Sequence, residues 1–344
     1  MKPYSTKYIL SFFLALALFL QAPGSFGIEQ HQQEPIKLKV LALPFISYSP
    51  FFIANDEGYF ADQRLKIEFI RMSTSEAAIP ALASGDLDIL GQELRTSSLN
   101  AIARNMKIRF VADKGHIPSD SCLYYIFIAR STLVKTGELK TPAQLKGRRI
   151  SLASGLGTSH GYFMEKMLNS AGLKFSDVEI VEVPAAVQSE AMQKGLIDIA
   201  VGGEPWATRF LESGHGVLWR TVQEFIPHST YDVVSYGPTL LQKNPEAGKR
   251  FMVAYLKAVR QYNQGKTERN LEIITKNTGF DRELLKRACW PPIRSDGKIE
   301  IKSVLDFQDW SIKKGLLDKP VTENQFWDPS FIEYANQVLG PATK

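Results

Sequence analysis

The loop at residues 154–161 carries residue types that can bind an anion or supply a nucleophile. It holds three glycines together with Thr158, Ser159 and His160, and it lies between a strand-like segment and a helix-like one. Backbone amides at a helix start, helped by the two hydroxyls, favour a negative or strongly accepting group. The alternative is an ordinary capped helix start. A P-loop is excluded because no Gly-Lys-Ser/Thr follows, and the glycine spacing differs from the dinucleotide fingerprint.

The same loop matches the nucleophile elbow of α/β-hydrolases, Gly-x-Ser-x-Gly, with Ser159 as the nucleophile. His215 or His228 would then act as the base, and Asp198 would orient it. Three observations count against this interpretation: the strand ends at residue 153 or 154, before the elbow; no His-Gly-Gly-type oxyanion segment lies upstream; and the chain is internally doubled. A secreted serine hydrolase is therefore the enzymatic alternative.

Two glutamates follow short apolar segments and can accept hydrogen bonds from a ligand amine or amide. They lie in Gly91-Gln92-Glu93 and in Gly202-Gly203-Glu204-Pro205-Trp206. Trp206 can stack on a planar group, with Tyr48 and Phe51 closing from the opposite side. The structural alternatives are that Glu204 caps the next helix and that Trp206 belongs to the core. For Asp88 and Asp198, a turn or cap role is favoured over catalysis. No histidine spacing typical of a metal site is present, so we expect no metal and no cofactor.

These candidate residues belong to a pattern that occurs twice, at an offset of 110 residues. Residues 81–89 and 191–199 share the frame Ala-x-x-x-Gly-x-x-Asp-Ile, and the strand-like segments 40–43 and 150–153 are related by the same offset. The loops 47–50 and 157–160 also correspond. Each copy has alternating strand and helix patterns, which predict parallel sheets in two α/β lobes. Ligands bind at the carboxyl ends of such strands, which predicts a cleft between the lobes.

The N-terminal residues predict export. Two lysines precede an apolar run at 9–20, and small residues follow near residue 27, as in a cleaved signal peptide covering 1–27. An uncleaved anchor is the alternative, although the run is shorter than the roughly 20 residues of a membrane span. Removal of the two lysines lowers the formal charge from +5 to +3, with no long basic run, so nucleic-acid binding is not expected. Cys122 and Cys289 form either a disulfide or two separate thiols.

Several segments resemble those of a known family. Residues 50–60 (PFFIANDEGYF), 65–68 (LKIE), 81–88 (ALASGDLD), 145–150 (LKGRRI), 191–198 and 204–206 (EPW) are similar, in this order, to solute-binding proteins of ABC importers for nitrate, sulfonates, taurine and the thiamine pyrimidine precursor. Residues 278–281 and 314–317 resemble the family's C-terminal helices. The resemblance runs from about residue 36 to 339, which is nearly the whole chain after residue 27.

The resemblance implies a type II periplasmic binding fold, an α/β fold with two lobes joined by two crossing segments. The implied domains are a first lobe at 28–125, a second lobe at 126–230, and a return to the first lobe with C-terminal helices at 231–344. It implies a periplasmic monomer that is not an enzyme, closes on a small solute and delivers it to an ABC permease and its ATPase. A ligand-binding sensor is a further alternative. The implied ligand contacts are Ser47, Tyr48, Phe51, Gln92, Glu93, Gly157, Thr158, Ser159, His160, Glu204 and Trp206.

The sequence departs from the family pattern in two respects. Neither main loop carries a lysine or arginine, which weakens an inorganic-anion interpretation, and Arg95 is the one nearby cation that can be nominated. Pyrimidine-synthesising relatives use a cysteine-rich motif, whereas this chain has two cysteines in total. A planar, donor-bearing molecule such as a zwitterion or a pyrimidine is the ligand that these features favour.

Overall fold

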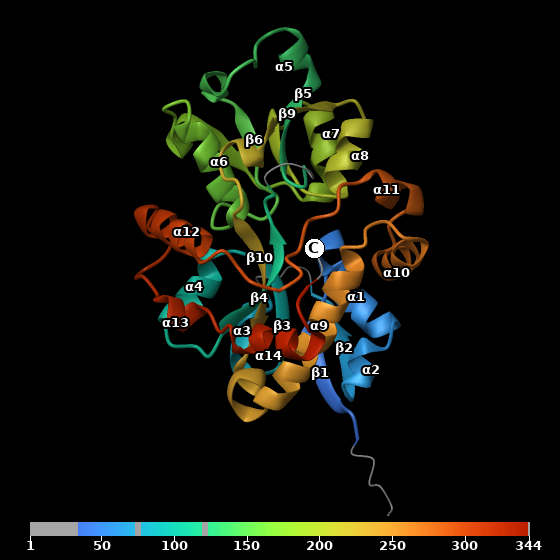
Figure 1. The fold of residues 1–344 in the computed structure, drawn as a ribbon. Coiled ribbons are helices and arrows are strands. Elements are labelled where there is room, and N and C mark those ends of the chain that lie inside the picture. The colour runs from blue at the N-terminus through green and yellow to red at the C-terminus, as the bar shows by residue number, and fades with distance from the viewer. Residues whose placement is uncertain (1–33, 73–76, 119–122, 343–344) are drawn as a thin grey trace, which may run out of the picture. The chain divides into compact units, whose positions relative to one another are not determined.

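The computed structural model describes residues 34–72, 77–118 and 123–342, so the predicted signal peptide and Cys122 lie outside the described residues. Residues 35–344 form one compact unit, in which two five-stranded mixed sheets have helices on both faces (Figure 1). We call each sheet with its helices a lobe. The first sheet contains β2 (Leu65–Ile70), β1 (Ile36–Leu41), β3 (Ile89–Glu93), β10 (Thr230–Tyr236) and β4 (Arg109–His116), in this spatial order. The second contains β7 (Glu179–Val181), β6 (Arg149–Ser151), β8 (Ile199–Gly202), β5 (Ile126–Arg130) and β9 (Gly216–Thr221).

The two sheets are built alike, which confirms the predicted fold of two lobes and two crossings. In each sheet three strands are parallel, and the fourth strand in order pairs antiparallel with both neighbours. That fourth strand is β10 in the first sheet and β5 in the second, and each follows a connection from the other lobe. The chain passes into the second lobe between β4 and β5, which is the first connection, and residues 222–229 lead back.

The offset of 110 residues is reproduced in the strand register. Val40 pairs with Ile89 in the first sheet, and Ile150 pairs with Ile199 in the second. The repeated aspartates also make equivalent contacts: Asp88 Oδ2 accepts the Lys39 amide at 2.8 Å, and Asp198 Oδ2 accepts the Arg149 amide at 2.9 Å. Each carboxylate thus ties the turn before one parallel strand to the neighbouring strand, which is a structural role.

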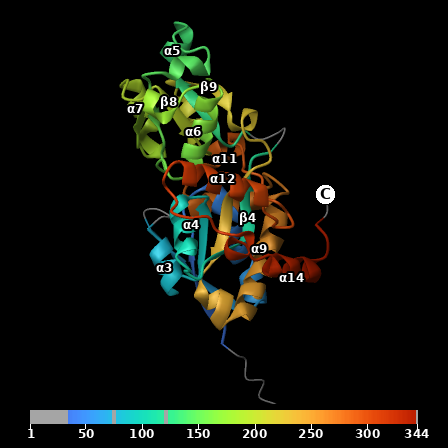
Figure 2. The same ribbon diagram turned by 90° about the vertical axis from the view of Figure 1, so that its left-hand side faces the viewer.

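Helices cover the first sheet on both sides, as Figure 2 shows for α3 and α4 on one side and α9 and α14 on the other. Helix α9 is the longest of the described helices because Asn244 caps its start and a continuous apolar face lies against the core. None of the described helices is both long and apolar enough to cross a membrane. Within the described residues, the α-helices are α1 (Ser49–Asp56), α2 (Tyr59–Asp62), α3 (Ile79–Ser84), α4 (Thr96–Ala103), α5 (Ser131–Lys135), α6 (Ser159–Asn169), α7 (Gln188–Gln193), α8 (Trp206–Glu212), α9 (Pro245–Tyr262), α10 (Glu268–Thr278), α11 (Arg282–Arg287), α12 (Ile301–Lys313), α13 (Glu323–Phe326) and α14 (Ser330–Leu339).

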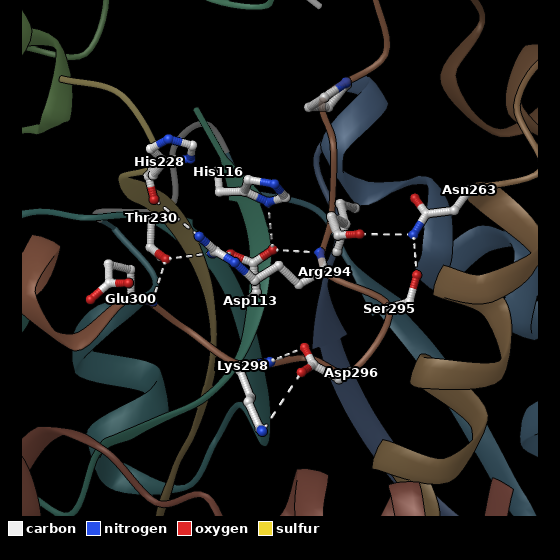
Figure 3. A network of polar contacts seen from close by, with 12 residues as sticks. Asp113, His116, His228, Thr230, Asn263, Arg294, Ser295, Asp296, Lys298 and Glu300 are labelled. Atoms are coloured by element: carbon white, nitrogen blue, oxygen red, sulfur yellow. Dashed lines mark hydrogen bonds and ion pairs between the residues drawn. The ribbon is translucent and has the colours of Figure 1, made fainter. Parts of the chain in front are cut away.

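Residues 288–300 form a strap that holds the ends of the two connections together (Figure 3). Asp113 of β4 is fully buried and accepts the Arg294 amide at 2.8 Å and Arg294 Nη1 at 3.2 Å. The same guanidinium donates to Thr230 Oγ1 and to the His228 carbonyl, both at 3.0 Å. Further backbone bonds join the strap to β4, from the Asp113 amide to the Gly297 carbonyl at 2.8 Å. One arginine therefore ties the strand that leaves the first lobe to the strand that returns to it.

Candidate functional site

A cavity of about 470 Å³ has walls from both lobes and from the connection between them. From the first lobe come side chains at the carboxyl ends of β1 and β3 and on β4 and β10, and from the second lobe those after β6, β7 and β8. This is the position that parallel strand ends predict for a ligand. Among the eleven predicted contacts, six line the cavity: Ser47, Tyr48, Glu93, His160, Glu204 and Trp206.

Two buried ion pairs lie in the wall of the first lobe. Lys114 Nζ, on β4, is 2.7 Å from Asp232 Oδ2, on β10, and donates to Ser47 Oγ at 2.9 Å. The ammonium also lies 4.0 Å from the centroid of the Tyr48 ring, a cation–π contact. Arg95 Nη2 is 2.7 Å from Glu93 Oε1, and both side chains are almost completely buried. The pairing matters because a buried charge without a partner is strongly unfavourable.

Aromatic rings form much of the remaining wall. Tyr124 and Tyr125, from the first connection, meet edge to face with ring centroids 4.8 Å apart. Tyr125 also contacts the His160 ring at 5.0 Å, which joins the connection to the second lobe. Tyr48 holds its position because its hydroxyl donates to the Gly91 carbonyl at 2.6 Å. These rings give the cavity flat apolar surfaces suited to a planar ligand.

Glu204 and Trp206 combine the two roles that the sequence left open. Glu204 lines the cavity and also accepts from the Thr208 amide at 2.9 Å and the Thr208 hydroxyl at 2.7 Å, as a helix-capping residue does. Its Oε1 accepts a further bond from the Cys289 amide at 3.2 Å, at the start of the strap. Trp206 lines the cavity and packs edge to face on Phe280 at 5.4 Å. Both residues therefore connect the cavity to the C-terminal region.

The loop before α6 does not present its amides to the cavity as the sequence suggested. The Ser159 amide donates to the Leu94 carbonyl at 2.9 Å, and the His160 amide donates to Thr158 Oγ1 at 3.2 Å. Gly157, Thr158 and Ser159 are absent from the cavity wall. The Ser159 bond joins the two lobes, since Leu94 follows β3 of the first lobe and Ser159 begins α6 of the second, and the Thr96 amide likewise donates to the Gly157 carbonyl at 2.9 Å. The helix start therefore acts as an interlobe contact.

Two further predicted contacts lie behind the wall. Phe51 is fully buried in the first lobe, where its ring packs against Tyr255 at 5.2 Å and against Phe251 at 6.0 Å. The side chain of Gln92 donates from Nε2 to Ser235 Oγ and accepts at Oε1 from Ser98 Oγ, and both distances are 2.7 Å. Their side chains support the cavity residues Tyr48 and Glu93, which neighbour them in structure or sequence.

The residues of the hydrolase alternative are held by other partners. The Ser159 hydroxyl donates to Glu93 Oε2 at 3.1 Å. Asp198 is paired with Arg130 and the Arg149 amide, and His215 Nδ1 is 3.2 Å from the Ser189 hydroxyl. The structure therefore does not assemble a serine, a histidine and an aspartate in the predicted order.

Sequence reasoning missed Lys114, Asp232, Tyr124 and Tyr125, and it missed Glu182 at the mouth of the cavity. It named Arg95 as the one nearby cation, whereas Lys114 is a second. The alternation of β4 and β10 contained a signal, because a lysine and an aspartate within apolar strands are expected to be paired.

Burial sets the protonation of several wall residues. It raises the pKa of Asp232, which Lys114 opposes, and it raises the pKa of Glu204, which the Thr208 bonds oppose. It lowers the pKa of His160, against the nearby carboxylate of Glu93, so that the imidazole is neutral at pH 7. Nδ1 of His160 is buried and has no hydrogen-bond partner among the described residues.

The strap also carries a cysteine. Cys289 is disulfide-bonded, and Cys122, the other cysteine of the sequence, lies outside the described residues. The pairing of Cys122 with Cys289 stays a prediction.

Solved structures show the same fold. A ligand-binding component of an ABC-type import system from Staphylococcus aureus superposes with a TM-score of 0.71 at 14% identity, over 87% of this chain and 99% of the other. The alkanesulfonate-binding protein of Xanthomonas axonopodis pv. citri gives 0.68 at 17% identity, over 86% and 99%. The nitrate-binding protein of Synechocystis PCC 6803 gives 0.71 at 16% identity, over 90% of each chain.

Sequence comparison adds a closer relationship. A protein of Brucella abortus whose name describes it as a binding protein is 26% identical over 149 residues, which is 43% of this chain and 46% of the relative. The match thus spans less than half the relative's length. The sequence model of the family described as NMT1/THI5-like matches residues 46–264, which include the sheet of the second lobe, four strands of the first sheet and most of the cavity wall. Because this match covers more than half of the chain, the protein belongs to the NMT1/THI5-like family.

Proposed function

We propose that this protein is the solute-binding component of an ABC importer and that it captures one small organic molecule in the cavity. The observation that carries the proposal is the wall itself, which combines side chains from both lobes and from the connection between them. A ligand held there contacts both lobes at once, so its binding energy favours a closed arrangement over an open one.

Membership of the family and the fold shared with ligand-binding components of import systems support this proposal. By the same reasoning the protein acts in the periplasm as a monomer, after removal of residues 1–27, and offers the closed form to a membrane permease and its ATPase. It binds its solute without converting it.

The wall favours an organic solute over an inorganic anion. Lys114 and Arg95, the two cations that line the cavity, already contact the carboxylates of Asp232 and Glu93. An inorganic anion would have to compete with these buried carboxylates, whereas a planar molecule can use the aromatic surfaces and donate to Glu204. Among the solutes expected from the sequence, a pyrimidine-like molecule fits this wall better than nitrate.

The experiment is a thermal-shift screen of the mature protein with nitrate, taurine, sulfonates, pyrimidines, flavins and amino acids. A ligand at a hundredfold excess over its Kd stabilises the folded state by about 2.7 kcal/mol. Recovery of the compound unchanged after incubation supports binding without chemistry. If no compound raises the melting temperature, the proposal fails.

Ser159→Ala separates binding from hydrolysis. Its hydroxyl donates to Glu93 Oε2, so we expect the variant to bind more weakly because an interlobe contact is lost. Loss of a measurable esterase activity in the same variant, with binding unaffected, would support the hydrolase instead.

A further inference from the structure

The cavity wall carries more negative charge than positive charge. Among the described residues, four carboxylates line it, Glu93, Glu182, Glu204 and Asp232, against two cations, Arg95 and Lys114. His160 adds no charge at neutral pH because burial lowers its pKa. When all four acids are ionised, the formal excess is therefore two negative charges.

The excess belongs to Glu182 and Glu204, because each of the two cations is within 2.7 Å of one of the other acids. Glu204 accepts three hydrogen bonds, from the Thr208 amide, the Thr208 hydroxyl and the Cys289 amide, and none of these donors is a cation. Lys266 acts on Glu204 only through a longer-range attraction, and its Nζ donates to the Lys286 carbonyl at 2.6 Å. Among the described residues, Glu182 forms neither a hydrogen bond nor an ion pair, and it is exposed at the mouth of the cavity.

Electrostatics and shape then point to the same kind of occupant. An anion would enter against this excess and would find both cations already neutralised, whereas a cation would offset the carboxylates. The rings of Tyr48, Tyr124 and Trp206 line the same cavity, and aromatic rings attract a positive charge through their quadrupoles, as Lys114 on Tyr48 and Arg209 on Trp206 already show within the protein. A planar cation can use the rings and the carboxylates together.

We propose that the cavity takes a small organic cation with a planar body and discriminates against an anion of similar size. This inference rests on the proposed solute-binding function and narrows its substrate class. Discrimination comes from Glu182, at the mouth, and Glu204, in the wall of the second lobe.

Three probes of nearly equal size isolate the charge: benzamidinium, benzamide and benzenesulfonate. Each is titrated by isothermal calorimetry into the mature protein at one pH and one ionic strength. Two unneutralised carboxylates in a partly buried site predict binding of benzamidinium roughly tenfold or more tighter than that of benzenesulfonate, with benzamide between them.

Glu182→Gln is the first variant, because the side chain is exposed and its loss should leave folding intact. It should weaken benzamidinium severalfold and leave benzamide unchanged, while Glu204→Gln should do the same from inside the cavity. Glu179→Gln is the matched control: it removes an exposed glutamate from β7, three residues away and outside the wall.

The outcomes separate this inference from the function on which it rests. Benzenesulfonate binding as tightly as benzamidinium, or more tightly, overturns the charge preference but leaves solute binding in place. An equal effect of Glu179→Gln and Glu182→Gln also overturns it, because the preference would then come from general surface charge. If none of the three probes binds, the inference fails, and the thermal-shift screen decides separately whether the cavity binds a solute.

Discussion

Replacement of Arg294 by alanine should destabilise the protein more than removal of any exposed arginine. Arg294 lies in the strap, and its guanidinium donates to Asp113, Thr230 and the His228 carbonyl. Asp113 is fully buried. In the variant its carboxylate keeps the backbone amide of residue 294 and His116 Nδ1, which lies 3.3 Å away, but loses the guanidinium. The expected loss is about 3 kcal/mol, because breaking one side of a buried pair leaves an uncompensated charge.

The magnitude can be measured in urea and by heat. For a chain of this size, a loss of about 3 kcal/mol lowers Tm by roughly 6 °C. Arg250→Ala is the control, because Arg250 forms a 3.1 Å surface pair with Glu246 one helical turn away. Such pairs contribute about 0.5 kcal/mol.

A double variant tests the cause of the loss. Asp113→Asn removes the charge that Arg294 neutralises, so adding Arg294→Ala to it should cost less than Arg294→Ala alone, with a coupling energy of about 1–3 kcal/mol. A loss for Arg294→Ala no larger than for Arg250→Ala would refute the reasoning. So would full additivity in the double variant.

Three other predictions concern the cavity and its frame. Burial raises the pKa of Glu204 above its ordinary value, so the folded state holds this proton more tightly than the unfolded chain and loses stability as pH rises through the folded pKa. The Tm of Glu204→Gln minus that of the wild type should therefore increase as pH rises from about 4, near the pKa of the unfolded chain. Tyr48→Phe removes the buried bond to the Gly91 carbonyl and should lower the free energy of unfolding by about 1 kcal/mol in urea titration, and an unchanged midpoint would contradict this. Gly161→Ala places a Cβ 2.0 Å from the Leu156 carbonyl oxygen, which is backbone and cannot move aside. We expect the free energy of unfolding to fall by about 3 kcal/mol, or no soluble protein to form. Wild-type stability would contradict this and show that the turn before α6 can rearrange.

Much of the fold was predictable because local signals agreed with the repeat. The glycines at 85 and 195 end helices in both copies, with φ of +86° and +68°, and the aspartate three residues later anchors the next strand in each. Strand β1 alternates apolar and polar residues and β8 is a short apolar run, and both patterns are typical of strands.

β4 was missed because its middle does not look like a buried strand. Asp113 and Lys114 are among its most buried residues, yet each is made tolerable by a partner far away in sequence, Arg294 and Asp232. Local pattern indicates that such residues need partners but not which residues these are, so Lys114 and Asp232 were not assigned to the cavity wall. The anion-binding interpretation of the loop before α6 failed for the same reason: the Ser159 amide is satisfied by Leu94, from the other lobe.

The order of strands in the first sheet has a consequence for biosynthesis. β10 fills the place between β3 and β4, but it begins at Thr230, whereas β4 ends at His116. The second sheet needs only strands from the continuous stretch 126–221. As the chain leaves the ribosome, the second lobe can therefore be completed while β3 and β4 still have no strand between them. The lobe that begins the chain is the last to close, and the facing edges of β3 and β4 are open to pairing with other strands until β10 has been made.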